Sequence, residues 1–214
     1  RGMLFLQSEE YEKAVRDFSE AIQRDLYNPR FYLLRREAFL KLQNFAEARA
    51  DAAKVEWLGQ LANLTQRIVH EPTDPKRYVD RGTFWSEALE WKRALADFDR
   101  AINLNFQLAA AYSGRAAVHL MQENFNKAIA DCMLAIAIEP HQEAFSIRGD
   151  AHLKAGEYEL AIADYTEAKR IDSAVAQAYF LRSQELQKTG DDEQATQALE
   201  QALTLDPSLK QTPQ

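Results

Sequence analysis

The sequence predicts an all-helical protein built from repeated helical hairpins, and three observations support this fold class. The 214 residues include 34 Ala but only seven Gly and six Pro, a composition that favours helix over the frequent turns of a β-sandwich or barrel. One alanine recurs at spacings of 34, 46, 34, 33 and 34 residues. This column consists of Ala14, Ala48, Ala94, Ala128, Ala161 and Ala195. The period indicates an array of like units with one insertion of about 12 residues.

Each unit carries two helical stripes. An aromatic residue lies three positions before the alanine in five copies, at Tyr11, Phe45, Trp91, Phe125 and Tyr158. A second aromatic residue lies 16 positions before it in the five complete copies, at Tyr32, Tyr78, Tyr112, Phe145 and Tyr179. When the alanine is numbered position 20, the recurring residues fall at positions 4, 8 and 11 and again at 20, 24 and 27, each set on one helical face. A hairpin of two such helices cannot bury its own apolar face, so the hairpins are expected to stack.

The pattern within one unit resembles the tetratricopeptide repeat (TPR) family. The best copy contains Phe145, Gly149, His152, Gly156, Tyr158, Ala161, Tyr165 and Ala168. The family signature places an aromatic residue, small residues and a second aromatic at these points of a 34-residue unit. The resemblance implies a right-handed superhelical solenoid of antiparallel helix pairs, whose first helices line a concave groove that holds a peptide or protein segment.

The register of the repeat divides the chain into one array, residues 1–209, and a tail, residues 210–214. The copies span residues 1–28, 29–62, 75–108, 109–141, 142–175 and 176–209. The first copy is incomplete, because Arg1 already falls at position 7. We expect this chain to be a fragment of a longer protein and the polar last helix to be a true end of the array.

An insertion, residues 63–74, separates the second and third repeats. Leu61, Leu64, Ile68 and Val69 recur at helical spacing before the Pro72 and Pro75 breakers. The insertion either lengthens the preceding helix or forms a short separate one. Its apolar side is expected to pack on neighbouring repeats, with a partner-binding or self-associating surface over residues 59–74 as the alternative.

A charged ladder is predicted from positions 7 and 23. Position 7 is Arg in all six copies, while position 23 is Asp in five and Ala198 in the last. Pairing within a copy would leave Arg182 without an acid, so pairing each acid with the arginine of the next copy is preferred, with bidentate pairs that set the stacking register. The alternative is independent solvated charges. The predicted pairs are Asp17 with Arg35, Asp51 with Arg81, Asp97 with Arg115, Asp131 with Arg148, and Asp164 with Arg182.

The resemblance also implies which residues face the groove. Positions 2, 5, 9, 12 and 13 of the first helices line it, and their charges nearly balance. The candidate peptide-binding residues are Arg30, Leu33, Glu37, Lys41, Lys76, Val79, Thr83, Ser113, Ala117, Ser146, Asp150, Lys154, Phe180, Gln184 and Lys188. The small side chains Ser113, Ala117 and Ser146 leave room in the middle, and Phe180 supplies an aromatic anchor.

Charge and composition narrow the classes of partner. The net charge of −7 and the pI near 5.2 argue against nucleic-acid binding, which needs a basic stripe. No apolar run approaches the roughly 18 residues of a membrane span. The chain is expected to be soluble and, by default, cytoplasmic, with an extracytoplasmic site left open.

No catalytic or cofactor motif is found in the sequence, so no enzyme activity, metal or cofactor is expected. His119, Cys132 and His152 would be metal ligands only if they converged, and their positions are those of packed aromatic residues in other copies. The expected function is a non-catalytic protein-interaction scaffold that binds a peptide or protein segment in its groove. The alternatives are a regulatory or substrate-recruiting domain of a larger enzyme or of a secretion or assembly complex, and a self-associating module, a homodimer through residues 59–74.

Overall fold

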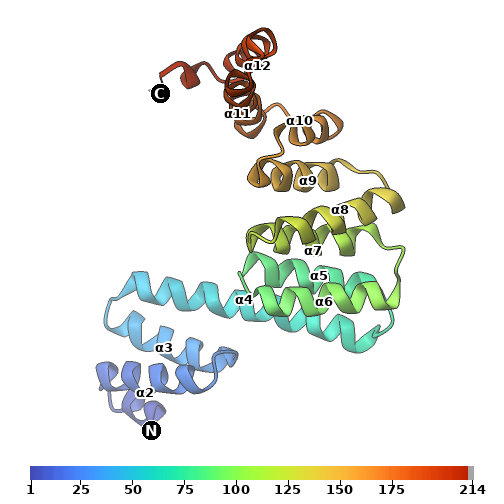
Figure 1. The fold of residues 1–214 in the computed structure, drawn as a ribbon. Helices are drawn as coiled ribbons and strands as arrows, with labels where there is room; N and C mark the ends of the chain where they lie inside the picture. Colours follow the sequence, from blue (N-terminus) through green and yellow to red (C-terminus); the bar gives the residue numbers. More distant parts are fainter. Residues whose placement is uncertain (212–214) are drawn as a thin grey trace. The chain divides into compact units, whose positions relative to one another are not determined.

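The computed structural model describes residues 1–211, which form twelve α-helices, one 3₁₀-helix and no strand (Figure 1). The all-helical fold class predicted from the sequence is therefore confirmed. The helices are α1 (Gly2–Gln7), α2 (Tyr11–Arg24), α3 (Pro29–Lys41), α4 (Phe45–His70), α5 (Pro75–Glu87), α6 (Trp91–Leu104), α7 (Ala109–Met121), α8 (Phe125–Ile138), α9 (Gln142–Ala155), α10 (Tyr158–Glu167), α11 (Ser173–Thr189), α12 (Asp192–Leu205) and the 3₁₀-helix η1 (Pro207–Gln211). Of the predicted tail, residues 210 and 211 lie in η1, and residues 212–214 lie outside the described part.

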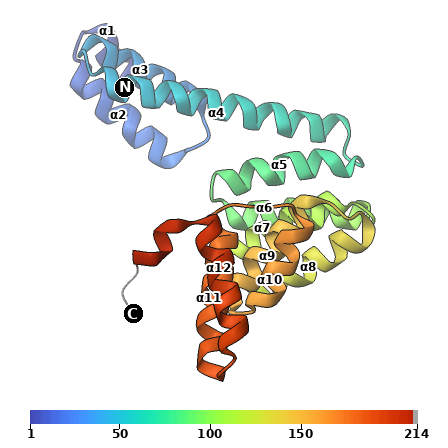
Figure 2. The same cartoon turned by 90° about the horizontal axis from the view of Figure 1, so that it is seen from above.

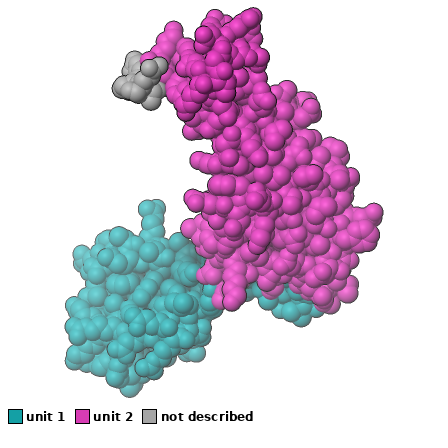
Figure 3. Space-filling view, in the orientation of Figure 1, with its two compact units in different colours: residues 1–71 teal, residues 72–214 magenta. Residues whose placement is uncertain are grey.

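The chain divides into two compact units. Residues 1–71 form unit 1, with helices α1 to α4, and residues from 72 onward form unit 2, with helices α5 to α12 and η1 (Figure 3). Each unit is built of antiparallel helical hairpins that follow one another along the chain (Figures 1 and 2). The hairpins are numbered one to six in chain order, from α1–α2 to α11–α12.

Unit 1 is held together by two apolar clusters. Phe18 and Ala14 pack with Ala38 in the first, and Ile22 packs with Leu58 in the second. Further side chains complete them, in the first cluster Phe5, Leu6, Tyr11, Val15 and Leu34, and in the second Tyr27, Phe31, Tyr32, Val55 and Trp57.

The insertion lengthens the second helix of hairpin two. Helix α4 runs without a break from Phe45 to His70, 26 residues against 14 for α2. No proline lies between Phe45 and Pro72, so this stretch contains no residue that breaks a helix by removing a backbone donor. Of the two forms that the sequence left open, the structure has the extended helix.

Every hairpin turns at the same position, 15, with a left-handed residue. Gly156 and Gly190 each have φ near +83°. The other four hairpins place residues with a side chain there, at φ values of 59° to 62°: Glu9, Gln43, Leu89 and Glu123. A short loop between antiparallel helices needs this backbone conformation, which glycine adopts at the lowest free-energy cost.

In unit 2, each hairpin packs on the next through its second helix, and hairpins three to five also pack through their first helices. Helix α5 packs on α7, α7 packs on α9, and the second helices α6, α8 and α10 pack on the first helix of the next hairpin. Small residues allow the close approach within hairpins, since a Cβ on Gly82 would lie 2.9 Å from Phe98 and one on Gly149 would lie 2.6 Å from Tyr165. The first helices α5, α7 and α9 thus form one layer of unit 2. Among the described residues, no helix has the length and apolar character that a membrane span requires.

Candidate functional site: the charged ladder and the first-helix face

An arginine of the first helix and an aspartate of the second pair within each of the first five hairpins. In hairpin three, Arg81 Nε donates to Asp97 Oδ2 and Arg81 Nη2 donates to Asp97 Oδ1, both at 2.8 Å. The same two-point contact recurs in the other four, with N···O distances between 2.5 and 3.0 Å. These pairs are Arg1–Asp17, Arg35–Asp51, Arg115–Asp131 and Arg148–Asp164.

The predicted pairing between repeats is therefore wrong, although the residues of the ladder are the ones predicted. Positions 7 and 23 each lie eight residues from the left-handed turn residue at position 15, so an antiparallel hairpin brings them level with each other. Arg81 and Asp97, for example, lie symmetrically about Leu89. The inter-repeat pairing was predicted from the number of unpaired charges, which does not reflect this symmetry.

The paired aspartates are buried, while the arginines keep partial contact with solvent. Asp51, Asp97, Asp131 and Asp164 are 3% to 6% exposed. The pKa of Arg115 is raised above its ordinary value, chiefly because its side chain donates hydrogen bonds to Asp131. Each two-point pair fixes the two helices of a hairpin relative to each other.

Contacts between successive hairpins use other acceptors. Arg115 Nη1 also donates to Asp99 Oδ1 of hairpin three, at 2.6 Å. Arg35 Nη1 donates in the same way to Ser19 Oγ of hairpin one, at 3.0 Å, from the equivalent pair of positions. Arg35 and Arg115 thus also join neighbouring hairpins, through position 25 of the preceding repeat rather than position 23.

Hairpin six departs from this arrangement because Ala198 replaces the aspartate. Arg182 Nη2 donates to Glu159 Oε1 of hairpin five, at 2.7 Å, and its buried Nε has no hydrogen-bond partner among the described residues. Open clefts of about 400 and 350 Å³ adjoin this arginine.

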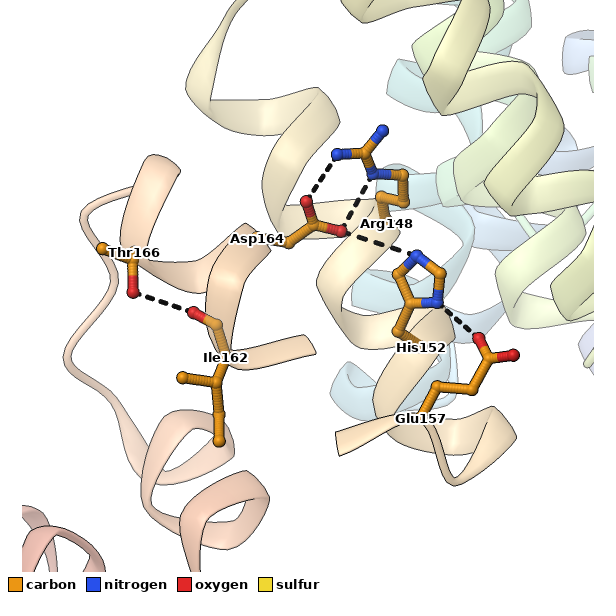
Figure 4. Close-up of polar contacts among 6 residues, drawn as sticks. All are labelled: Arg148, His152, Glu157, Ile162, Asp164 and Thr166. Carbon is orange, nitrogen blue, oxygen red and sulfur yellow. Dashed lines mark hydrogen bonds and ion pairs between the residues drawn. The ribbon is translucent and has the colours of Figure 1, made fainter. Parts of the chain in front are cut away.

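Hairpin five extends its ion pair into a four-residue network (Figure 4). Arg148 contacts Asp164, whose Oδ2 lies 3.7 Å from His152 Nε2. His152 Nδ1 lies 2.5 Å from Glu157 Oε2, at the start of α10. In Figure 4, the imidazole lies between the two carboxylates, and it joins the end of α9 to the turn that follows.

The two histidines and the cysteine that the sequence grouped do not form a metal site. No group of three or more His, Cys, Asp or Glu side chains within residues 1–211 could hold a metal ion. Cys132 is fully buried, and burial raises the pKa of its thiol to about 12. Burial lowers the pKa of His119, whose Nδ1 lacks a hydrogen-bond partner in the described chain. These side chains therefore occupy packing positions.

The candidate groove residues are mostly accessible. The structure places them on first helices, four on α3 in unit 1 and the rest on α5, α7, α9 and α11 in unit 2. The exposed ones are Arg30, Leu33, Glu37, Lys41, Lys76, Thr83, Lys154, Gln184 and Lys188. The half-buried ones are Val79, Ala117, Ser146, Asp150 and Phe180.

One candidate lies outside the accessible set. Ser113 is only 2% exposed, and its Oγ lies 2.9 Å from His141 Nε2, while His141 Nδ1 lies 2.7 Å from the carbonyl oxygen of Glu139. Ser113 therefore joins α7 to the segment before α9 and offers no open surface.

Sequence reasoning missed one residue at the first-helix face. Arg170, which follows α10, contacts both Ser146 and Asp150 of α9. Its repeat position belongs to the second helix, so the period gave no signal that it would reach the first.

Comparison with known families identifies the class of protein. Two sequence profiles, both described as tetratricopeptide repeat, match residues 1–61 and 135–176 in one case and residues 176–209 in the other. Together they cover more than half of the chain, which belongs to the tetratricopeptide repeat family. This fold supports the role of a protein–protein interaction scaffold.

Curated relatives are longer than this chain. A DnaJ homolog subfamily C member 7 homolog from Dictyostelium discoideum is 21% identical over 189 residues, 80% of this chain and 33% of that protein. RNA polymerase II-associated protein 3 from Homo sapiens is 26% identical over 190 residues, 82% of this chain and 27% of that protein. Dynein axonemal assembly factor 4 from Rattus norvegicus is 29% identical over 142 residues, 58% of this chain and 34% of that protein. The chain spans about a third of the length of these relatives.

Solved structures show the same fold at low sequence identity. MamA is 18% identical with a TM-score of 0.58, over 76% of this chain and 96% of that one. YrrB, described as a TPR protein with an unusual peptide-binding site, is 16% identical with a TM-score of 0.51, over 89% of this chain and 92% of that one. These likenesses support the solenoid of helix pairs predicted from the sequence.

Proposed function

We propose that the first-helix face of unit 2 binds a segment of a partner protein, and that the chain acts as a non-catalytic scaffold. The observation that carries this proposal is the kind of side chain on that face. Phe180 is half-buried between exposed polar neighbours, and Lys154 and Lys188 keep their charged groups in solvent. A half-buried aromatic side chain with polar neighbours is typical of a binding surface, since aromatic residues are enriched at the centres of interfaces and polar residues surround them.

The position of this face supports the proposal further. Because α7 packs on both α5 and α9, the exposed sides of these three helices form one continuous layer that a single extended or helical segment can contact. Lys154 lies on α9, in this layer, while Phe180 and Lys188 lie on the next first helix along the chain, α11. This layer belongs to unit 2 alone. The candidate residues of unit 1, on α3, form a second first-helix face with exposed Leu33 and Leu40.

Site-specific photo-crosslinking tests the location. A photoreactive phenylalanine analogue at Gln184, on the first-helix face of α11, should crosslink a partner in cell extract. The same analogue at Gln197, exposed on α12, provides the matched control. Equal crosslinking from both positions would contradict binding at this face.

Substitutions test the contribution of individual residues once the crosslinked partner is known. Phe180→Ala and Lys154→Glu should each weaken its binding by about tenfold or more, which corresponds to about 1.4 kcal/mol. Met133→Ala and Lys127→Glu make comparable changes on exposed sites of α8 and should have little effect. Unchanged binding by both groove variants would rule out the proposed function.

A second candidate follows from the length of the relatives. Because the chain matches about a third of each curated relative, it could serve as the regulatory or recruiting part of a larger protein. The coding sequence on either side of these residues tests this: a fused catalytic domain would support the recruiting role. Self-association through residues 59–74 also stays a prediction, and a monomer by sedimentation at high concentration would contradict it.

A further inference from the structure

Helix α10 ends one turn earlier than the other second helices. Helices α2, α6, α8 and α12 each have 14 residues, whereas α10 has 10 and ends at Glu167. Lys169 adopts φ of 55°, and the N–H of Arg170 donates to the carbonyl of Tyr165 at 3.0 Å, which closes the helix end. Ile171 consequently leaves the helix and is 81% exposed.

The early end of α10 directs Arg170 onto α9. Its Nη1 donates to Asp150 Oδ1 at 2.8 Å and to Ser146 Oγ at 3.3 Å. Its Nε donates to Asp172 Oδ2 at 2.9 Å. Its Cζ lies 4.6 Å from the centroid of the Tyr165 ring, and Tyr165 itself donates to Asp150 at 2.8 Å and is 0% exposed.

The other hairpins of the described chain have no cation at this repeat position. Four of them place uncharged, exposed residues there, each within its own second helix, and hairpin two has Trp57. The four are Gln23, Asn103, Ala137 and Thr204. Ser146 and Asp150, by contrast, occupy groove positions 5 and 9 of α9. The guanidinium group of Arg170 therefore lies on the first-helix face, where the proposed function places a partner.

We propose that Asp150, Ser146 and the Tyr165 ring form a subsite for a guanidinium group, that Arg170 occupies it in the free protein, and that the partner segment carries an arginine that takes the place of Arg170. This inference rests on the proposed function and names the chemistry of its partner. Guanidinium groups pair with carboxylates through a planar fork and stack on aromatic rings, which lysine does less well. The subsite offers both kinds of contact at once.

Charge complementarity favours a cationic occupant. With Arg170 displaced, the carboxylate of Asp150 loses its cation, and the face of the Tyr165 ring that Arg170 covered is free. An anionic or neutral side chain would leave the carboxylate of Asp150 without a cation, so a cationic side chain is selected, and the stacking on Tyr165 favours arginine over lysine. Because Arg170 occupies the subsite in the free protein, a partner segment must bind there with a more favourable free energy than Arg170 does in order to displace it.

The experiment uses the whole chain and a defined probe, N-acetyl-arginine methylamide. Arg170→Gln removes the internal guanidinium group, and Lys169→Gln removes the neighbouring exposed cation as the matched control. The probe should bind Arg170→Gln at least ten times more tightly than it binds the Lys169→Gln variant, as followed by the NMR resonances of Asp150 and Tyr165. Equal affinity for the two variants would overturn the proposal.

Two further arms establish the chemistry. The citrulline analogue of the probe has the same shape without the charge and should bind Arg170→Gln at least ten times more weakly. Asp150→Asn added to Arg170→Gln keeps an acceptor for the Tyr165 hydroxyl and should weaken probe binding at least tenfold. Binding that tolerates either change would show that no guanidinium subsite exists.

A variant that retains Arg170 keeps the proposal testable if Arg170→Gln does not fold. Asp172→Asn removes one of the two carboxylates that hold Arg170 and retains an N-cap for α11. It should bind the probe at least three times more tightly than the unmodified chain, and no gain would contradict displacement. These titrations use the arginine probe and not the cellular partner. If Phe180→Ala and Lys154→Glu left partner binding unchanged, the proposed function would be wrong, but the result of the probe titrations would stay the same.

Discussion

Hairpins four and five share one framework but pair their internal polar groups differently. Both contain the arginine–aspartate pair, and both place a histidine at position 11, next to that pair. His152 of hairpin five has Glu157 as a partner for its Nδ1, whereas the Nδ1 of His119 in hairpin four is buried and has none among the described residues. The repeat therefore determines where side chains lie, and local substitutions decide whether their polar atoms are satisfied.

The second helices of the two hairpins show a similar contrast. Helix α8 continues for 14 residues, and its last turn stays in the second-helix layer. Helix α10 is one turn shorter and ends at Glu167, and Arg170, which follows it, contacts the first-helix face. One framework thus yields a regular structural unit in one copy and a candidate binding subsite in the next.

The largest expected effect comes from removing the shared aspartate. Asp164→Ala should lower the free energy of unfolding of unit 2 by about 3–4 kcal/mol, because it leaves Arg148 partly buried without its acceptor. Asp131→Ala should cost about 2–3 kcal/mol, because Arg115 keeps Asp99. Urea unfolding followed by circular dichroism measures both. Asp99→Ala, at a half-exposed pair, is the control and should cost less than about 1 kcal/mol. A loss as large as that of Asp164→Ala would contradict this order.

The next effect distinguishes the two histidines. His119→Phe should raise the unfolding free energy by about 1 kcal/mol, because it removes a buried, unpaired nitrogen at a position where Phe39 occurs in hairpin two. His152→Phe should lower it by about 1 kcal/mol, because Glu157 loses its partner. Thermal and urea unfolding measure the signs. Gains from both substitutions would show that apolar packing, not hydrogen bonding, separates the two sites.

Acidification gives His119 a second signature. Burial lowers the pKa of this histidine in the folded chain below its value in the unfolded chain, so the folded state resists protonation. The stability that neutral His119 contributes is present above the unfolded pKa of about 6.5 and is lost as pH falls through the folded pKa. Unfolding free energies measured from pH 7.5 to 5 should fall less steeply in His119→Phe than in the unmodified chain. Parallel slopes would contradict the assignment.

A smaller effect comes from the turn residues. Glu123 adopts φ of 60° at the place where Gly156 adopts 83°. Glu123→Gly should stabilise hairpin four by about 0.5–1 kcal/mol, because glycine enters the left-handed region without a steric penalty. Gly156→Ala should destabilise hairpin five by about 1 kcal/mol. Melting temperatures measure both changes, and a loss on Glu123→Gly would mean that the glutamate side chain stabilises the turn.

The period of the sequence was enough to predict the helical class, the two helices per copy and the residues of the ladder. The number of charges at positions 7 and 23 was not enough to decide how they pair, because Arg182 forms its ion pair with Glu159, which lies at neither position. Symmetry about the turn residues, such as Leu89 between Arg81 and Asp97, was the signal in the sequence that indicated the pairing.

The first-helix face was predictable only where each residue keeps its repeat position. Ser113 is buried because His141, from a loop with no fixed position in the repeat, lies against it. Arg170 was missed because α10 ends at Glu167, where the left-handed residue that follows is Lys169 and no glycine marks the end of the helix. Local departures from the repeat depend on packing among neighbouring hairpins, which a period does not encode.

The smallest expected effect is the reactivity of Cys132, which shares position 24 with Tyr165. The thiol is 0% exposed and its pKa is raised to about 12, so at pH 8 only about one molecule in ten thousand would carry the thiolate. A disulfide reagent should therefore modify the chain at the rate at which hairpin four opens, not at the rate of a free thiol. Glu123→Gly should slow this modification, and Asp131→Ala should accelerate it, while urea-unfolded chain reacts at once. Fast labelling of the native chain, unaffected by either substitution, would mean that the interior of hairpin four is open to solvent.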